Sequence, residues 1–394
     1  MAHEQLRLSE VLAAAEAAAP AESVEVIARN LRDRFGARSV SFLVADVIGR
    51  RVVRIGDQDV SRQGRGAEQI PLSGTLYERA LRGQRLVQEP GAGRDLRVIV
   101  PVTNRGDAIG LLELTLPEAA GSVLEQVGEA AHALAFLIVM DRRFTDLYHW
   151  LERTTSVSLA AEIQRGLLPS AASYEGERFT LAGALVPADS VGGDTYDYAV
   201  DHDTLHLSIT DAMGHDVDSA LLATLTVNAS RGARRAGCDL AEQALRMHRT
   251  LLDHGHNGLA TGQLLRIAMD GAGTQVINAG HPWPLRLRGG AVEEVRLDVH
   301  LPFGVPSRTP FRVQPLDLRA GDRLILYTDG MQERRATAVD LAAVIRETAT
   351  EHPREVVRAA TAAVFEACRG QLQDDATILC LDWRGPRTGE RRAH

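Results

Sequence analysis

The sequence contains few cysteines, and long apolar runs are missing from it. Only three of the 394 residues are cysteines, at positions 238, 368 and 380, and none of them forms a CxxC pair. This number and spacing argue against a disulfide framework and a cysteine-based metal site, and they favour a reducing, cytoplasmic setting. The longest apolar run, around residues 133–140, is far shorter than the roughly 20 residues that span a bilayer. We therefore expect neither a secreted protein nor a membrane-spanning one.

Two sequence signatures of phosphate chemistry are also missing. The chain has no GxxxxGK[ST] loop, which argues against a nucleotide enzyme, and no CxxxxxR loop of the cysteine phosphatases. Acidic residues exceed basic ones, 52 against 44, so the net charge is −8. Such an average surface does not attract nucleic acid or an anionic membrane, and we expect neither as a partner.

The first part of the chain changes between helical and strand periodicity. The predicted helices are 5–19, 22–35 and 76–81, and the predicted strands are 39–44, 51–55, 96–102 and 109–116. The four strands predict two hairpins, with the short helix between them. A long helical pattern then covers 120–165, with a break near residue 154.

The second part, from about residue 178, is dense in predicted strands that have helices between them. The predicted strands are 179–184, 204–210, 264–269, 274–278, 284–287, 312–316, 323–327 and 376–381, and the predicted helices are 217–236, 239–253, 338–347 and 353–369. This mixture indicates an α+β fold in which antiparallel sheets pack against helices.

Four short segments of the second part place an aspartate beside glycine or another small residue, next to a strand or a turn. These aspartates are Asp194, Asp211, Asp329 and Asp374, and Asp375 follows the last of them. Carboxylate oxygens are ligands that Mg²⁺ and Mn²⁺ prefer, and small neighbours let the backbone approach closely. One Asp-Gly pair is usually only a turn. Four such segments together predict a site for two divalent cations.

These segments resemble the PPM (PP2C-type) serine/threonine phosphatases, in the bacterial SpoIIE/RsbU-like branch. The resemblance extends over residues 160–383. The phrases that carry it are EIQRGLLP at 162–169, GALVPA at 183–188, VGGD at 191–194, TDAMGHD at 210–216, NAGHP at 278–282, PFG at 302–304, LILYTDG at 324–330 and DDAT at 374–377. The fold that it implies is a PP2C-like β-sandwich flanked by helices.

The resemblance also implies a role for each acidic residue. The catalytic set would be Asp194, Asp211, Asp329 and Asp374, and the metal ligands would be these four with the Ala212 carbonyl and Asp375. Asp211 would bridge two Mn²⁺ or Mg²⁺ ions, with Asp194 and Ala212 on one side and Asp329 and Asp374 on the other. Asp375 would be a ligand or a neighbour of the ligands. The arginine that holds phosphate in eukaryotic members has no obvious counterpart.

The order of elements in the first part resembles the GAF family of signal-sensing domains, with support from PV at 101–102 and GLLEL at 110–114. The two resemblances together divide the chain into four segments. These are a GAF-like α/β sensor domain at 1–118, a helical linker at 119–170, a phosphatase domain at 171–384 and a disordered tail at 385–394. No ligand of the sensor domain follows from the sequence.

The resemblance therefore implies a cytoplasmic enzyme that hydrolyses phosphoserine or phosphothreonine on a regulatory protein by means of metal-activated water. A STAS-type anti-sigma factor antagonist is the substrate protein that the family implies, and a homodimer through the linker helix is the expected assembly. The alternative is a degenerate phosphatase domain that senses a ligand and binds a partner without hydrolysis.

The sequence leaves two possible roles open for His281 and two for a set of three arginines. His281 either donates a proton to the leaving group or fixes its loop. Arg231, Arg234 and Arg235 either contact an acidic partner or form a solvated helix face.

Overall fold

The computed structural model describes residues 8–46, 49–55, 67–91, 93–117, 121–152, 158–188, 192–214, 216–332 and 334–386. The chain divides into two compact units, residues 1–156 and 157–394. Each unit has its own sheets and its own hydrophobic cores.

The first unit contains five helices and six strands among the described residues. They are α1 (Leu8–Glu16), α2 (Ser23–Phe35), β1 (Ser39–Ala45), β2 (Arg51–Ile55), β3 (Gln69–Pro71), α3 (Leu76–Gly83), β4 (Val87–Pro90), β5 (Leu96–Asn104), β6 (Asp107–Leu116), α4 (Gly121–Asp141) and α5 (Leu147–Glu152). The predicted order of helix, helix, hairpin, short helix, hairpin and long helix is present in this unit.

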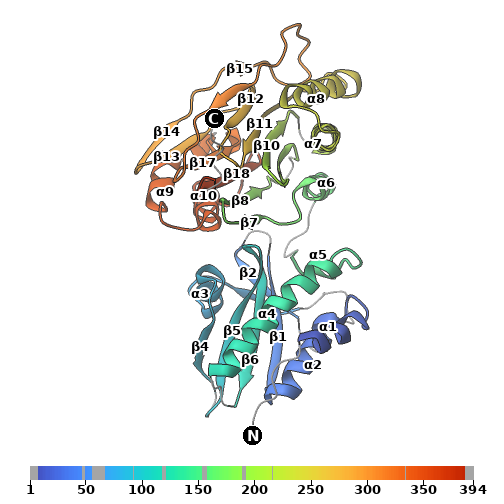
Figure 1. The fold of residues 1–394 in the computed structure, drawn as a ribbon, viewed down its shortest axis with the longest axis vertical. Coiled ribbons are helices and arrows are strands. Elements are labelled where there is room, and N and C mark those ends of the chain that lie inside the picture. Colours follow the sequence, from blue (N-terminus) through green and yellow to red (C-terminus); the bar gives the residue numbers. More distant parts are fainter. Residues whose placement is uncertain are drawn as a thin grey trace. The chain divides into compact units, whose positions relative to one another are not determined.

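The strands of the first unit form one antiparallel sheet in the order β3-β2-β1-β6-β5-β4. Side chains alternate between its two faces, as the pleat of a strand requires. Phe42 of β1 and Val100 of β5 lie in the larger core with helices α1, α2 and α4, whereas Leu43 and Ile99 lie in the smaller core with α3. Figure 1 shows α3 on the opposite side of this sheet from α1, α2 and α4.

Helix α4 is a core helix of the first unit. Val127, Leu134 and Ile138 are buried on it and belong to the larger core. Among the described residues it is also the one helix whose length and hydropathy meet the criteria for a membrane span, a test that core helices of folded domains also pass. The predicted linker segment 119–170 is thus divided: α4 and α5 belong to the first unit, and a later helix belongs to the second.

The second unit is built from two sheets and their helices. Its elements are α6 (Leu159–Leu167), β7 (Ser173–Glu175), β8 (Phe179–Val186), β9 (Asp194–Val200), β10 (Thr204–Ala212), α7 (Asp216–Arg235), α8 (Leu240–His254), β11 (Ala260–Ala268), β12 (Thr274–Ala279), β13 (Leu285–Arg288), β14 (Ala291–Glu294), β15 (Val299–His300), β16 (Gln314–Leu316), β17 (Arg323–Tyr327), the 3₁₀ helices η2 (Asp329–Met331) and η3 (Arg334–Ala338), α9 (Leu341–Glu347), α10 (Pro353–Ala367) and β18 (Ala376–Trp383).

The two sheets of the second unit pack face to face. One has the order β15-β12-β11-β10-β9, with β16 beside β12, and the other has the order β14-β13-β17-β18-β8-β7. Along β18, Leu379 and Leu381 face the core between the sheets, whereas Ile378 and Cys380 face the core under α9 and α10. A third core lies under α7 and α8 on the other sheet. Figure 1 shows these two helix pairs on opposite sides of the sandwich, so the predicted sandwich flanked by helices is present.

Two groups of elements differ from the sequence prediction. Strands β3, β4, β7, β14 and β15 were not expected, and each of them is at most four residues long. Strand β9 was not expected either, because it contains two aspartates, a residue that is depleted in strands. This strand matters most, since it begins at Asp194. Residues 387–394 of the predicted disordered tail lie outside the described residues.

Candidate metal centre

Asp194 and Asp211 lie side by side on neighbouring strands of one sheet. Asp194 is the first residue of β9, Asp211 is near the end of β10, and the two are direct partners in the antiparallel register. Asp194 is 2% exposed, whereas Asp211 is half-buried. Ala212 follows Asp211, and its N–H donates a hydrogen bond to the Gly193 carbonyl oxygen over 3.1 Å.

Asp329 and Asp374 are placed by the other sheet. Asp329 comes two residues after β17 and begins η2, and Asp374 comes two residues before β18. Both carboxylates are half-buried. Strands β17 and β18 are antiparallel neighbours, so the end of the first and the start of the second meet at the same edge of the sheet.

Thr328 connects the two sheets at this edge. Its hydroxyl donates to Asp194 Oδ2 over 2.6 Å and accepts a bond from the Thr377 N–H over 3.0 Å. Its backbone N–H donates to the Thr377 carbonyl oxygen over 3.0 Å. The segment that carries Asp329 is therefore fixed to both Asp194 and the start of β18.

Two glycines allow the segments to come this close. A Cβ atom on Gly193 would lie 2.2 Å from the Ala212 carbonyl oxygen, and one on Gly330 would lie 1.9 Å from the Asp375 carbonyl oxygen. Both distances are far below van der Waals contact, so any side chain there would push the backbone apart. The glycines of the two motifs serve close backbone approach here rather than only a turn.

Asp375 is buried, and both of its carboxylate oxygens accept hydrogen bonds within the protein. The Ala188 N–H donates to Oδ1 over 2.8 Å, and Gln164 Nε2 donates to Oδ2 over 2.5 Å. Gln164 Nε2 also donates to the Asp194 carbonyl oxygen over 2.8 Å. We call the ends of the two sheets that carry Asp194, Asp211, Asp329, Asp374 and Asp375 the acidic edge. Helix α6 contacts both sheets there through the Gln164 side chain, which is 1% exposed.

Asp194 and Asp375 are buried acids whose charge the surrounding groups only partly compensate. Burial raises the pKa of Asp194 well above its usual range, the charges of Asp211 and Asp375 raise it further, and the Thr328 hydroxyl opposes this. Burial also raises the pKa of Asp375, against the bonds from Ala188 and Gln164. Among the described residues, the groups that contact Asp194 and Asp375 are hydroxyls, amides and other carboxylates, not cations.

These residues fit divalent cations. The donors are carboxylate and carbonyl oxygens, which hard cations prefer, and the repulsion at Asp194 is of the kind that a bound cation relieves. Within the described ranges, however, no three Asp, Glu, His or Cys side chains converge into a ready metal cage. Residues 191 and 215, which belong to the predicted motifs, lie outside the described residues.

Two of the three arginines on α7 have an internal role. Arg231 Nη2 donates to Asp197 Oδ1 over 2.8 Å and Arg234 Nη1 donates to Asp197 Oδ2 over 3.0 Å, and Asp197 is buried in β9. Arg231 Nη2 also donates to the Leu167 carbonyl oxygen at the end of α6 over 2.6 Å. Both interpretations drawn from the sequence were therefore wrong for Arg231 and Arg234, whose charges compensate an acid within the fold.

His281 is fixed beside the acidic edge. Its Nδ1 lies 2.8 Å from the hydroxyl of Thr261, the strand neighbour of Asp211. The Asn278 side chain holds the backbone of His281 from both sides, with an accepted bond of 2.8 Å and a donated one of 2.9 Å. Burial lowers the pKa of His281 to about 3. These contacts favour the loop-fixing role over proton donation.

We expect the His281 ring to stay neutral between pH 8 and pH 5. Its pKa in the folded state lies below the ordinary value of about 6.5, so the folded protein resists protonation and loses stability as the pH falls below that value. Imidazole ¹⁵N shifts recorded through this range check the expectation. A titration of this ring with a midpoint near 6.5 would contradict it.

Part of the second unit matches a known protein family. Residues 201–384 match the family model described as Stage II sporulation protein E (SpoIIE). The match includes Asp211, Asp329 and Asp374, and it begins after Asp194. The matched segment lies within the second unit and covers slightly less than half of the chain, so this part of the second unit is similar to that family.

Individual relatives lie in the same class. The phosphoserine phosphatase RsbU of Bacillus subtilis is 21% identical over 248 residues, which cover 58% of this chain and 70% of that protein. The RsbU and RsbW domains of Rv1364c from Mycobacterium tuberculosis are 25% identical with a TM-score of 0.47, over 56% of this chain and 64% of that one, less than two thirds of its length. The SiaA-PP2C domain of Pseudomonas aeruginosa is 23% identical with a TM-score of 0.45, over 57% of this chain and 93% of that one. The family match and the RsbU relative identify a protein serine/threonine phosphatase.

Two functional residues were missed in the sequence. Gln164 stands on α6 among Ala160, Ala161 and Leu167, the other residues buried on that helix. A glutamine on the apolar face of an amphipathic helix is a signal, because a buried amide needs partners. Thr328 gives no such signal, since threonine is common at the ends of strands.

Proposed function

We propose that this chain hydrolyses phosphoserine or phosphothreonine on a regulatory protein in the cytoplasm, with two Mn²⁺ or Mg²⁺ ions at the acidic edge. The observation that carries the proposal is the meeting of the four aspartate segments where both sheets end, with Gln164 and Thr328 joining them. The family match and the RsbU relative support the reaction class.

The family resemblance implies a division of roles among the acids, and the contacts of Asp375 add to it. Asp211 would bridge the two ions, with Asp194 and the Ala212 carbonyl on one side and Asp329 and Asp374 on the other. Asp375 is better suited to positioning, because both of its oxygens already accept bonds from Ala188 and Gln164. Its backbone also packs against Gly330, so it fixes the segment that carries Asp329.

The chemistry follows from this donor set. When bound, two divalent ions supply a hydroxide near neutral pH and neutralise charge on the phosphoryl oxygens. The protein's own residues hold the donors in place: Thr328 orients Asp194, and Gln164 orients Asp375. Burial keeps the His281 ring neutral, and the hydrogen bond with Thr261 fixes its position.

A phosphatase assay tests the proposal directly. The full chain is incubated with p-nitrophenyl phosphate and with phosphorylated regulatory proteins, in the presence of Mn²⁺, of Mg²⁺ or of EDTA. We expect release of phosphate that needs a divalent ion. Binding of a phosphorylated partner without any hydrolysis would instead establish the degenerate binding module.

The proposal extends to the substrate protein and to the assembly of the chain. A STAS-type anti-sigma factor antagonist is the substrate that the family resemblance implies, and the first unit, with its six-stranded antiparallel sheet, would be a GAF-like sensor. Helix α4 carries exposed Phe136, Val139 and Met140. This apolar stripe supports a homodimer through α4, and sedimentation velocity at micromolar concentration, with Phe136→Glu for comparison, checks it.

Replacing Gln164 by methionine is expected to raise the Mn²⁺ concentration for half-maximal activity about 10- to 100-fold, the usual effect of losing a group that orients metal ligands. Methionine keeps the length of the side chain but cannot donate to Asp375 or Asp194. The matched control is Gln243→Met, since buried Gln243 donates to Ser230 between α7 and α8. Equal Mn²⁺ dependence in both variants would show that Gln164 does not position the acids.

A further inference from the structure

A solvent-open hollow lies directly beside the acidic edge. It is shallow, with a cavity volume of about 20 Å³, and Gly330 and Asp374 line one part of it. The rest is lined by Arg335 of η3, by Cys368 just after α10 and by the segment before β18 that includes Gln371 and Leu372. The hollow therefore shares Gly330 and Asp374 with the candidate metal centre.

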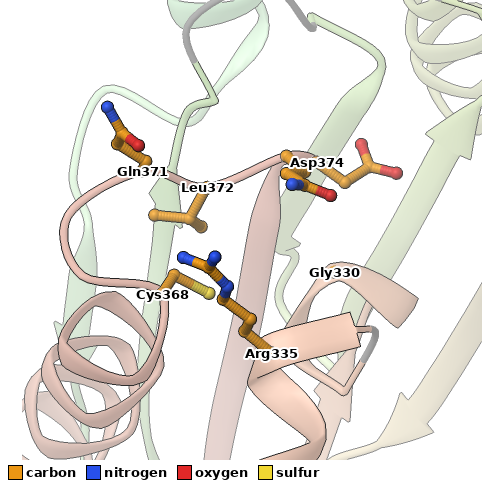
Figure 2. Close-up of a pocket in the computed structure, with 7 residues that line it drawn as sticks. Gly330, Arg335, Cys368, Gln371, Leu372 and Asp374 are labelled. Carbon is orange, nitrogen blue, oxygen red and sulfur yellow. The ribbon is translucent and has the colours of Figure 1, made fainter.

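The hollow extends away from the acids rather than surrounding them. Figure 2 shows the Asp374 carboxylate directed away from Cys368 and Leu372, whereas the Arg335 side chain reaches toward Cys368. A phosphoryl group at the acids would therefore be on the other side of Asp374 from the guanidinium. A polypeptide with its phosphorylated residue at the acids can still place a neighbouring side chain in the hollow.

Arg335 differs from the other arginines of this unit that are anchored in the fold. Arg231 and Arg234 are held by Asp197, Arg288 by Asp322 and Arg323 by Asp382. Arg335 is exposed and forms no ion pair or hydrogen bond with the described residues. Its positive charge is thus available to a group that enters the hollow.

The other walls define the chemistry of that group. Leu372 and Cys368 are 8% and 7% exposed and form an apolar wall, and Gln371 adds an exposed amide. A guanidinium binds planar carboxylates through paired, charge-assisted N–H donors. A lysine side chain would meet Arg335 with like charge, so the hollow selects against a basic residue.

We propose that Arg335 and the hollow bind an acidic side chain of the substrate protein, adjacent in its sequence to the phosphorylated residue. This inference rests on the proposed phosphatase function and adds a preference among substrates to it. Arg335 acts here as a specificity-determining residue that touches the substrate polypeptide.

The test uses the full chain and two kinds of substrate. One kind is a series of phosphoserine peptides that differ only in carrying glutamate, glutamine or lysine at one position within three residues of the phosphoserine. The other is p-nitrophenyl phosphate, which has no flanking residues. We expect one position at which the wild-type protein prefers glutamate over glutamine about tenfold in kcat/KM, a difference that lies in KM, as for a charge-assisted hydrogen bond.

Three variants of Arg335 and one control separate the outcomes. Arg335→Ala is expected to abolish the preference for glutamate, Arg335→Lys to keep part of it and Arg335→Glu to favour the lysine peptide. Arg308→Ala removes another exposed arginine of the same unit and should leave the preference as it is.

Each result either supports or overturns the proposal. A wild-type protein with no preference at any position, or a preference that survives Arg335→Glu, overturns it. A loss of activity on p-nitrophenyl phosphate as large as that on the peptides would also overturn it, because Arg335 would then act on the phosphoryl group. Absence of wild-type hydrolysis of every substrate would instead refute the proposed function itself.

Discussion

Asp211→Asn is expected to reduce metal-dependent phosphatase activity about a thousandfold or more while the fold stays intact. Asp211 lies directly opposite Asp194 in the strand register and is the acid that we propose as the bridge between the two ions. An amide has the same size but lacks the charge and one of the two acceptor oxygens. Loss of several kcal/mol of charge stabilisation corresponds to this factor, since each 1.4 kcal/mol is tenfold in rate.

The measurement is kcat/KM for p-nitrophenyl phosphate over a range of Mn²⁺ concentrations, together with circular dichroism of the variant. Asp253→Asn is the control, because Asp253 is an exposed aspartate on α8 in the same unit. Its activity should equal that of the wild-type chain. If Asp211→Asn kept a tenth or more of the activity, Asp211 would not be a bridging ligand.

Asp194→Asn is expected to change stability in opposite directions without and with Mn²⁺. In the metal-free protein, burial and then repulsion by Asp211 and Asp375 destabilise the Asp194 carboxylate and raise its pKa. A neutral amide removes this repulsion and should raise the unfolding midpoint by at least about 2–4 °C, the effect of roughly 1 kcal/mol in a domain of this size. In excess Mn²⁺ the wild-type chain should be the more stable, because saturation to 100 times the dissociation constant adds about 2.7 kcal/mol.

The pH dependence of stability is a second test of Asp194→Asn. A carboxyl group with a raised pKa in the folded state costs no stability below its ordinary pKa, and the cost grows as the pH rises toward the folded-state pKa. The stability gain of Asp194→Asn in EDTA should therefore increase with pH above about 4. Thermal unfolding of both proteins at several pH values measures it.

Asp197→Asn is the matched control for Asp194→Asn. Asp197 is a second buried aspartate of β9, but Arg231 and Arg234 compensate its charge. Removing that charge leaves two guanidinium groups without their partner, so the variant should be less stable with or without Mn²⁺. If Asp194→Asn and Asp197→Asn lowered the stability of the metal-free protein equally, the charge of Asp194 would not be an uncompensated one.

The sequence predicted most elements of the fold because their periodicity is strong. The near-continuous apolar runs of β1, β5, β17 and β18 come from side chains that fill cores on both faces of a sheet. Strand β9 escaped prediction because its stability depends on partners distant in the chain. Asp197 is acceptable within β9 only because Arg231 and Arg234 arrive from α7, more than 30 residues later.

In the site, too, the local sequence predicts some residues, whereas contacts between distant residues can be seen only in the structure. The acidic residues are recognisable in the sequence because the aspartates stand beside glycine and alanine at strand ends. The need for Gly330 becomes visible only when the Asp375 carbonyl oxygen lies against it. The link from Gln164 to Asp375 joins residues 211 positions apart, so no local pattern reveals it.

The position of bound manganese tests the account most directly. Crystals of the full chain grown in excess Mn²⁺ and measured at the manganese absorption edge would give an anomalous difference map. We expect two peaks about 3.5–4 Å apart, with Asp211 between them, Asp194 on one side and Asp329 and Asp374 on the other. A map with no manganese among these four carboxylates, or with ions only elsewhere on the chain, would contradict it.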